Sequence, residues 1–224
     1  MKVGVVYTGT TPELIADVER EVKSQLGEQV EFYNQADPTI IQDANKVGYV
    51  TTAPAARLVG MFAKAAEEGC DAILNCCSSV GEVADAAQDL GKYLGVPIVR
   101  IDELMCREAV LRGSRVGVMA TLPTTLNPTK NTVLRVAREM NRHVTVEDIL
   151  VEGAFGLDQE QFRKRLSDAA GEIIDKVDVI VLAQGSMAYA AADLTAKYGK
   201  PFLGSPHYGA IALKRALADK GILS

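Results

Sequence analysis

Short apolar runs alternate with longer amphipathic stretches along the chain. In the first half, four apolar runs have the length of a strand and are bounded by polar or turn residues. We expect these strands over 2–7, 30–33, 72–74 and 97–101. Periodic apolar positions between them predict helices over 12–26, near 39–44, 52–68, 80–90 and 102–112. Strands that alternate with helices predict an α/β fold with parallel sheets covered on both faces.

The pattern of the first half restarts near residue 115. Three blocks recur in the same order: Lys2–Thr8 as Arg115–Thr121, Asp71–Leu74 as Asp178–Val181, and Gly95–Val99 as Gly199–Leu203. This predicts two pseudo-symmetric, flavodoxin-like α/β lobes whose strand tips line an active-site cleft between them. We place the first lobe at 1–103 plus 207–224 and the second at 104–206. In this arrangement, the helix over 102–112 crosses to the second lobe, and a last helix over 208–218 returns to the first.

Composition narrows the expected partners and compartment. The 224 residues carry a net charge of −5 with both signs interspersed, so nucleic acid is not an expected partner. No apolar run approaches 18 residues and the N-terminus lacks a signal-peptide pattern, so we expect no membrane segment and a cytoplasmic location. Four cysteines and two histidines form neither a disulfide framework nor a paired Cys-x-x-Cys metal motif. Nucleotide-binding glycine motifs are also missing, so no metal and no cofactor is expected.

Candidate chemistry concentrates where the strand over 72–74 ends. Cys76 and Cys77 follow this strand, and Ser78 and Ser79 lead into the next helix. Helix N-terminal N–H groups can hold an anion and lower the pKa of a thiol. A thiol, hydroxyls and free N–H groups together predict a site for a small carboxylate. We expect Cys77 to face this site and Cys76 to point into the flank of the sheet.

The repeat gives Cys77 a counterpart, because Cys77 lies six residues after Asp71 and Gln184 lies six residues after Asp178. We expect these two positions to face each other across the cleft. Hydroxyl and glycine residues on the strand-tip loops are the predicted substrate contacts, although they could serve only as helix caps. They are Thr8, Gly9, Thr10, Thr52, Ser78, Ser79, Thr121, Thr124, Thr125, Gly185 and Ser186.

A histidine at the tip of the last strand is a second candidate for acid–base chemistry. The unperturbed pKa of His207 suits proton transfer at neutral pH, although His207 could equally begin the last helix without a chemical role. Its counterpart in the repeat is Glu103, a weaker candidate. Tyr189 could line the pocket.

Three motifs resemble the aspartate/glutamate racemase superfamily, which includes glutamate racemase, hydantoin racemase, maleate isomerase and arylmalonate decarboxylase. Cys77-Ser78-Ser79 resembles the Cys-Asn-Thr motif of this group. The block Val181–Ala188 resembles Val-Leu-Gly-Cys-x-Gly-Met-Ala of hydantoin racemases, and Gly117–Thr121 followed by Thr124-Thr125 resembles the Thr-x-x-Thr loop. The resemblance implies a cofactor-independent racemase or isomerase that acts next to a carboxylate or hydantoin of a small molecule. It also implies that Cys77 is the proton carrier or nucleophile, and it suggests a homodimer.

Gln184 departs from the pattern of the family. In the racemases, two cysteines act from opposite faces of the substrate, and a glutamine cannot transfer protons. A single-cysteine decarboxylase or lyase that works through an enediolate is therefore an alternative, with Gln184 hydrogen-bonded to a substrate oxygen. A further alternative is a non-catalytic small-molecule binding protein of the same fold.

Overall fold

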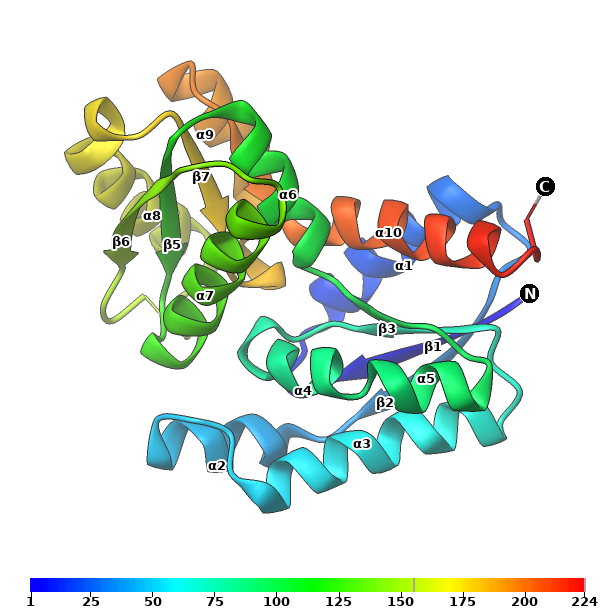
Figure 1. Cartoon of the computed structure of the whole chain (residues 1–224). Helices are drawn as coiled ribbons and strands as arrows, with labels where there is room; N and C mark the ends of the chain where they lie inside the picture. The colour runs from blue at the N-terminus through cyan, green and yellow to red at the C-terminus, as the bar shows by residue number, and fades with distance from the viewer. Residues whose placement is uncertain (155, 224) are drawn as a thin grey trace. The chain divides into compact units, whose positions relative to one another are not determined.

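The computed structural model describes residues 1–154 and 156–223. The chain forms two compact units: Met1–Asp102 with the segment from Pro206 onward, and Glu103–Ser205. Each unit holds a four-stranded parallel sheet with helices around it (Figure 1). The predicted α/β fold with two lobes of parallel sheet is confirmed.

The first unit has the strand order β2-β1-β3-β4, the arrangement of a flavodoxin-like sheet. Its strands are β1 (Lys2–Tyr7), β2 (Glu31–Ala36), β3 (Ala72–Asn75) and β4 (Ile98–Arg100). Its helices are α1 (Pro12–Leu26), α2 (Pro38–Val47), α3 (Thr52–Glu67), the single turn η1 (Ser78–Val80), α4 (Gly81–Ala86), α5 (Gln88–Leu94) and α10 (Ser205–Asp219). Helix α10 begins at the last residue of the second unit and otherwise belongs to the first.

Alternating side chains of β1 and β3 form two cores, one on each face of the first sheet. Val5, Tyr7 and Leu74 pack with apolar residues of α1 and α10 on one face. Val6 and Ile73 pack with residues of α2, α3 and α4 on the other. Both faces are buried because parallel strands joined by helical crossovers are covered on both sides.

The second unit repeats this arrangement with the strand order β6-β5-β7-β8. Its strands are β5 (Arg115–Ala120), β6 (Thr145–Leu150), β7 (Val179–Leu182) and β8 (Phe202–Gly204). Its helices are α6 (Glu103–Arg112), α7 (Pro123–Glu139), α8 (Gln159–Ile173), the 3₁₀ turns η2 (Ile174–Lys176) and η3 (Gly185–Ala190), and α9 (Ala191–Tyr198). One face of the sheet packs against α8, η3 and α9, around Met119, Ile180 and Leu182.

The sequence repeat is also a repeat of hydrogen bonds. Asp71 accepts from the backbone N–H of Lys2 at 2.9 Å, and Asp178 accepts from the backbone N–H of Arg115 at 2.9 Å. Each aspartate also donates its own N–H to the carbonyl of the same partner, at 2.7 Å in both units. The carboxylates therefore fasten the start of β1 and β5 to the strand beside them.

Three predicted helix boundaries differ from the structure. The helix expected over 80–90 is instead the turn η1 and two short helices that break at Ala87, whose ψ is 4°. The short helix expected near 39–44 extends over Pro38–Val47, because Asp37 caps it by accepting from the N–H of Thr39. The last helix begins at Ser205, earlier than the predicted 208. Within the described ranges, no helix has both the length and the apolar character needed to cross a membrane.

Replacing Asp178 tests how strongly these carboxylates hold the sheets. Hydrogen bonds from the Arg115 guanidinium and backbone lower the pKa of Asp178 from 3.8 to about 2. Because the folded pKa lies below the ordinary value, this stabilisation is present above about pH 4 and is lost as the pH falls towards 2. We expect Asp178→Asn to cost about 1 kcal/mol at pH 7, a value that allows for solvent screening, and to flatten the loss of stability between pH 4 and 2.

Urea unfolding at a series of pH values measures this effect. Asp71→Asn is the matched control, because Asp71 accepts one backbone N–H whereas Asp178 accepts two and also binds Arg115. A larger loss for Asp71→Asn than for Asp178→Asn would contradict this explanation.

Candidate active site

The first unit places Thr8 and Cys77 on either side of the point where its strand order reverses. Thr8 follows β1 and Cys77 follows β3, and these adjacent strands pair in register with Val6 opposite Asn75. The backbone N–H of Cys76 extends the pairing by donating to the Val6 carbonyl at 2.9 Å. In open α/β sheets, ligands bind at such a switch point, outside the carboxyl ends of the strands.

The two neighbouring cysteines point to opposite faces of the sheet. Cys76 is buried in the apolar core that contains Tyr7 and Leu74, and burial raises its pKa well above the ordinary value. Cys77 is half-buried and packs at the edge of the other core, near Val80. Of this pair, Cys77 is therefore the thiol that a small molecule can reach.

Hydrogen-bond donors surround the sulfur of Cys77. Burial raises the pKa of this thiol, whereas the Thr8 hydroxyl and the backbone N–H groups of Ser79 and Val80 oppose that rise. The net shift is upward, so the thiol is protonated at neutral pH. The Thr8 hydroxyl is fully buried beside the thiol.

The other predicted contacts of the first unit divide into two groups. Ser78 and Ser79 are buried in the turn η1 directly after Cys77. Gly9, Thr10 and Thr52 are exposed, on the loop after β1 and at the first residue of α3. The structure brings Thr8, Ser78 and Ser79 together with Cys77, and it shows no contact of the three exposed residues with the thiol.

His207 lies at the surface of the first unit, in the first turn of α10. Its Nδ1 lies 3.0 Å from Oε2 of Glu21, and its ring meets that of Tyr208 edge to face. Glu21 is the tenth residue of α1 and lies about 14 Å along the helix from its first residue, Pro12, which follows Thr8 by four positions. This placement does not bring His207 to Cys77, so the predicted proton transfer by His207 gains no support.

In the second unit, Gln184 occupies the place that Cys77 has in the first. Each residue lies two positions after its strand and precedes a 3₁₀ turn, in extended backbone conformation. The Thr121 N–H donates to Oε1 of Gln184 at 2.7 Å, and the Thr121 hydroxyl donates to the same atom at 2.9 Å. Because a backbone N–H can only donate, Oε1 must face Thr121 and Nε2 must point away. Among the described residues, Nε2 has no acceptor, so it offers two N–H groups to a ligand.

The remaining predicted residues of the second unit lie close to this pair along the chain. Thr124 and Thr125 belong to the first turn of α7, and Gly185 and Ser186 begin η3. Thr125 is buried, and its N–H donates to the Leu122 carbonyl at 3.1 Å. Tyr189 packs against Phe162 further along η3.

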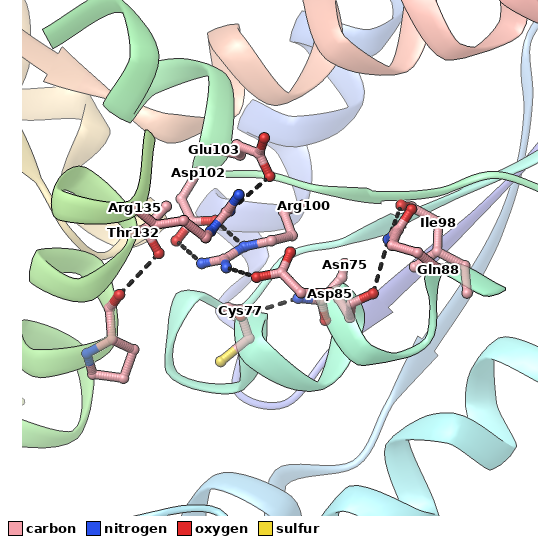
Figure 2. A network of polar contacts seen from close by, with 12 residues as sticks. Asn75, Cys77, Asp85, Gln88, Ile98, Arg100, Asp102, Glu103, Thr132 and Arg135 are labelled. Carbon is pink, nitrogen blue, oxygen red and sulfur yellow. Dashed lines mark hydrogen bonds and ion pairs between the residues drawn. The ribbon is translucent and has the colours of Figure 1, made fainter. Parts of the chain in front are cut away.

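The sequence analysis did not predict the buried charge cluster that lies near Cys77 (Figure 2). Arg100 binds Asp102 through two hydrogen bonds of 3.0 Å and Asp85 through one of 2.6 Å. Burial by itself would lower the pKa of Arg100, but Asp102 and Asp85 reverse the effect and raise it. A possible signal was the charged pair Arg100 and Asp102 in the apolar run that contains β4. Over the described residues, no group of three His, Cys, Asp or Glu side chains is placed to hold a metal ion.

Comparison with solved structures finds the same fold in several racemases. An allantoin racemase from Klebsiella pneumoniae is 19% identical with a TM-score of 0.68, over 100% of this chain and 89% of that one. A glutamate racemase isoform from Bacillus anthracis is 17% identical with a TM-score of 0.70, over 99% and 83%. An unliganded arylmalonate decarboxylase is 15% identical with a TM-score of 0.61, over 96% and 92%. At these identities the likeness shows the fold alone.

No curated protein matches the chain. A family model described as Asp/Glu/Hydantoin racemase matches residues 3–212, which is nearly the whole chain. This family supports an enzyme of the racemase or isomerase type. The chain belongs to the Asp/Glu/hydantoin racemase family.

Proposed function

We propose that this protein moves a proton at the carbon next to a carboxylate, or next to a hydantoin carbonyl, of a small molecule, with Cys77 as the proton carrier. The single observation that carries the proposal is the Cys77 thiol at the switch point, with the Thr8 hydroxyl and the N–H groups of Ser79 and Val80 around it. Family membership makes racemisation or isomerisation the first candidate reaction.

The donors around Cys77 suit the charge that such a reaction creates. Removing a proton next to a carboxylate produces an enediolate, whose negative charge spreads over the two oxygens. Fixed N–H and O–H donors stabilise such a negative charge strongly when they lie in a site from which water is excluded. In this proposal, Cys77 exchanges the proton with the carbon, and the nearby donors hold the oxygens. His207 has no step in it.

Gln184 favours a second candidate, a decarboxylase or lyase with one proton carrier. The position equivalent to Cys77 holds an amide that cannot titrate, and Thr121 fixes that amide as a donor. Loss of carbon dioxide from a malonate-type substrate leaves an enediolate that needs one proton. The protonated Cys77 thiol can supply this proton.

Deuterium exchange tests the role of Cys77. We expect wild-type protein in D2O to place solvent deuterium at the carbon next to the carboxylate of its substrate. Proton NMR over a panel of amino acids, hydantoins, hydroxy acids and malonates measures this exchange. Cys77→Ser should slow it at least about 100-fold, because positioned acid–base groups contribute factors of this size. Cys76→Ser is the matched control and should retain the exchange, since Cys76 is buried in the core.

The same panel separates the candidates. Inversion of configuration together with exchange supports a racemase, and release of carbon dioxide from a malonate supports the second candidate. Equal exchange by Cys77→Ser and wild type would show that Cys77 is not the carrier. Ligand-induced stabilisation without exchange of any compound would support a binding protein.

Thr8→Val tests the environment of the thiol. The Thr8 hydroxyl lowers the pKa of Cys77, so removing it should shift the alkylation of Cys77 to higher pH. The rate of iodoacetamide labelling between pH 6 and 10, followed at the Cys77 peptide by mass spectrometry, measures the shift. Thr10→Val is the control, because Thr10 is exposed and hydrogen-bonds to the Thr11 carbonyl. An unchanged or lower midpoint in Thr8→Val would contradict the assigned contact.

Gln184→Cys tests whether the chain uses a single carrier. In a protein that protonates from one side, a second thiol at the repeat-equivalent position should create or raise racemase activity. Chiral chromatography of the product after incubation in D2O measures inversion, and Gln184→Ser is the control that removes the amide without adding a thiol. Unchanged inversion in Gln184→Cys would show that this position does not take part in proton transfer.

A further inference from the structure

Arg100 connects the end of strand β4 with the helix that follows the Cys77 turn. Its guanidinium is almost fully buried and grips the Asp102 carboxylate through two parallel hydrogen bonds. Its third contact is Asp85 in α4, on the far side of the turn from β3. Arginine suits this position because its planar fork can bind one carboxylate in two places and still reach another.

Gly81 brings the guanidinium against the backbone of the turn. Gly81 is the first residue of α4 and the fourth after Cys77. A Cβ at Gly81 would lie 2.3 Å from Nη2 and 2.4 Å from Cζ of Arg100. A residue with a side chain could not occupy this position unless either the guanidinium or the turn moved. The guanidinium of Arg100 therefore packs directly against the backbone at the start of α4.

The other end of the turn is tied to the same strand. The Ile101 N–H donates to the Asn75 carbonyl at 3.1 Å, which continues the pairing of β3 with β4. Nδ2 of Asn75 donates to the carbonyl of Cys77 at 3.1 Å (Figure 2). The segment that carries Cys77 is thus attached to the end of β4 on both sides, through Asn75 before the thiol and through Gly81 and Asp85 after it.

We propose that Arg100, oriented by Asp102, is a positioning residue that sets the place of the Cys77 thiol by holding Gly81 and Asp85. Cys77 precedes the turn, whereas Ser79 and Val80 lie in it, directly before α4. A shift of α4 would therefore move the N–H groups of Ser79 and Val80 relative to the sulfur. A misplacement of about 1 Å can cost about 100-fold in rate. The effect on turnover rests on the proposed function, whereas the effect on thiol reactivity does not.

Three variants test whether Arg100 positions the Cys77 thiol. Arg100→Lys keeps the charge but cannot grip Asp102 in two places, Gly81→Ala pushes the turn from the guanidinium, and Asp85→Asn weakens the contact to α4. We expect each to change the pH profile of iodoacetamide labelling at Cys77. Arg100→Lys and Gly81→Ala should lower kcat for deuterium exchange about 10- to 100-fold, with a smaller change in KM.

Arg115→Lys is the matched control, because Arg115 makes a similar double contact with Asp178 in the other unit. It should leave the labelling of Cys77 and kcat unchanged. Thermal unfolding followed by circular dichroism identifies the variants that fold. If Arg100→Lys and Gly81→Ala do not fold, Asp85→Asn still tests the proposal, because the Asp85 side chain is one-third exposed.

Folded variants with a lowered melting temperature but wild-type labelling of Cys77 would overturn the proposal and leave Arg100 with a structural role only. A wild-type protein that exchanges no compound, combined with altered labelling in the variants, would refute the proposed function and support the positioning of the thiol.

Discussion

The parallel pairing of β1 with β3 is the constraint on which the candidate site depends. Val6 lies opposite Asn75, and the N–H of Cys76 continues the ladder by one residue. Side chains alternate between the faces of a sheet, so this register sends Cys76 into the core and turns Cys77 towards the edge. A slip of one residue would exchange the two thiols. The chemistry proposed for Cys77 is therefore a consequence of sheet register before it is a property of the cysteine.

Duplication gives the second unit the same frame with different chemistry. Thr8 and Cys77 follow β1 and β3, and Thr121 and Gln184 follow the equivalent strands β5 and β7. In the first unit the threonine hydroxyl lies beside a titratable thiol, whereas in the second the threonine locks an amide as a hydrogen-bond donor. The backbone conformation is the same in both units, but the second has a glutamine, which cannot transfer a proton, where the first has a cysteine. This difference is the physical reason to consider one proton carrier in a family named for racemases.

The sequence predicted those features that depend on local pattern. Apolar runs and their recurrence indicated two parallel sheets, and the residues after the third strand indicated the site. The break at Ala87 was missed because alanine and glutamine favour a continuous helix. In the structure, the side chain of Gln88 donates to the carbonyls of Ala84 and Ile98. The Arg100 cluster was missed because Asp85 and Asp102 are brought to the same guanidinium only when the chain crosses from β3 to β4. The contact of His207 with Glu21 was not predicted, because it depends on how α10, which begins at Ser205, packs beside α1.

The central claim is that Cys77 lies beside a site for a carboxylate. A comparison of the rates at which two alkylating reagents label Cys77 tests this claim most directly. Iodoacetate carries the carboxylate that iodoacetamide lacks. The rate ratio of iodoacetate to iodoacetamide at Cys77 is compared with the same ratio for glutathione. Hydrogen bonds from Thr8, Ser79 and Val80 should raise the ratio at Cys77 about tenfold or more above that of glutathione. A ratio at or below that of glutathione, or faster labelling of Cys76, would contradict the account.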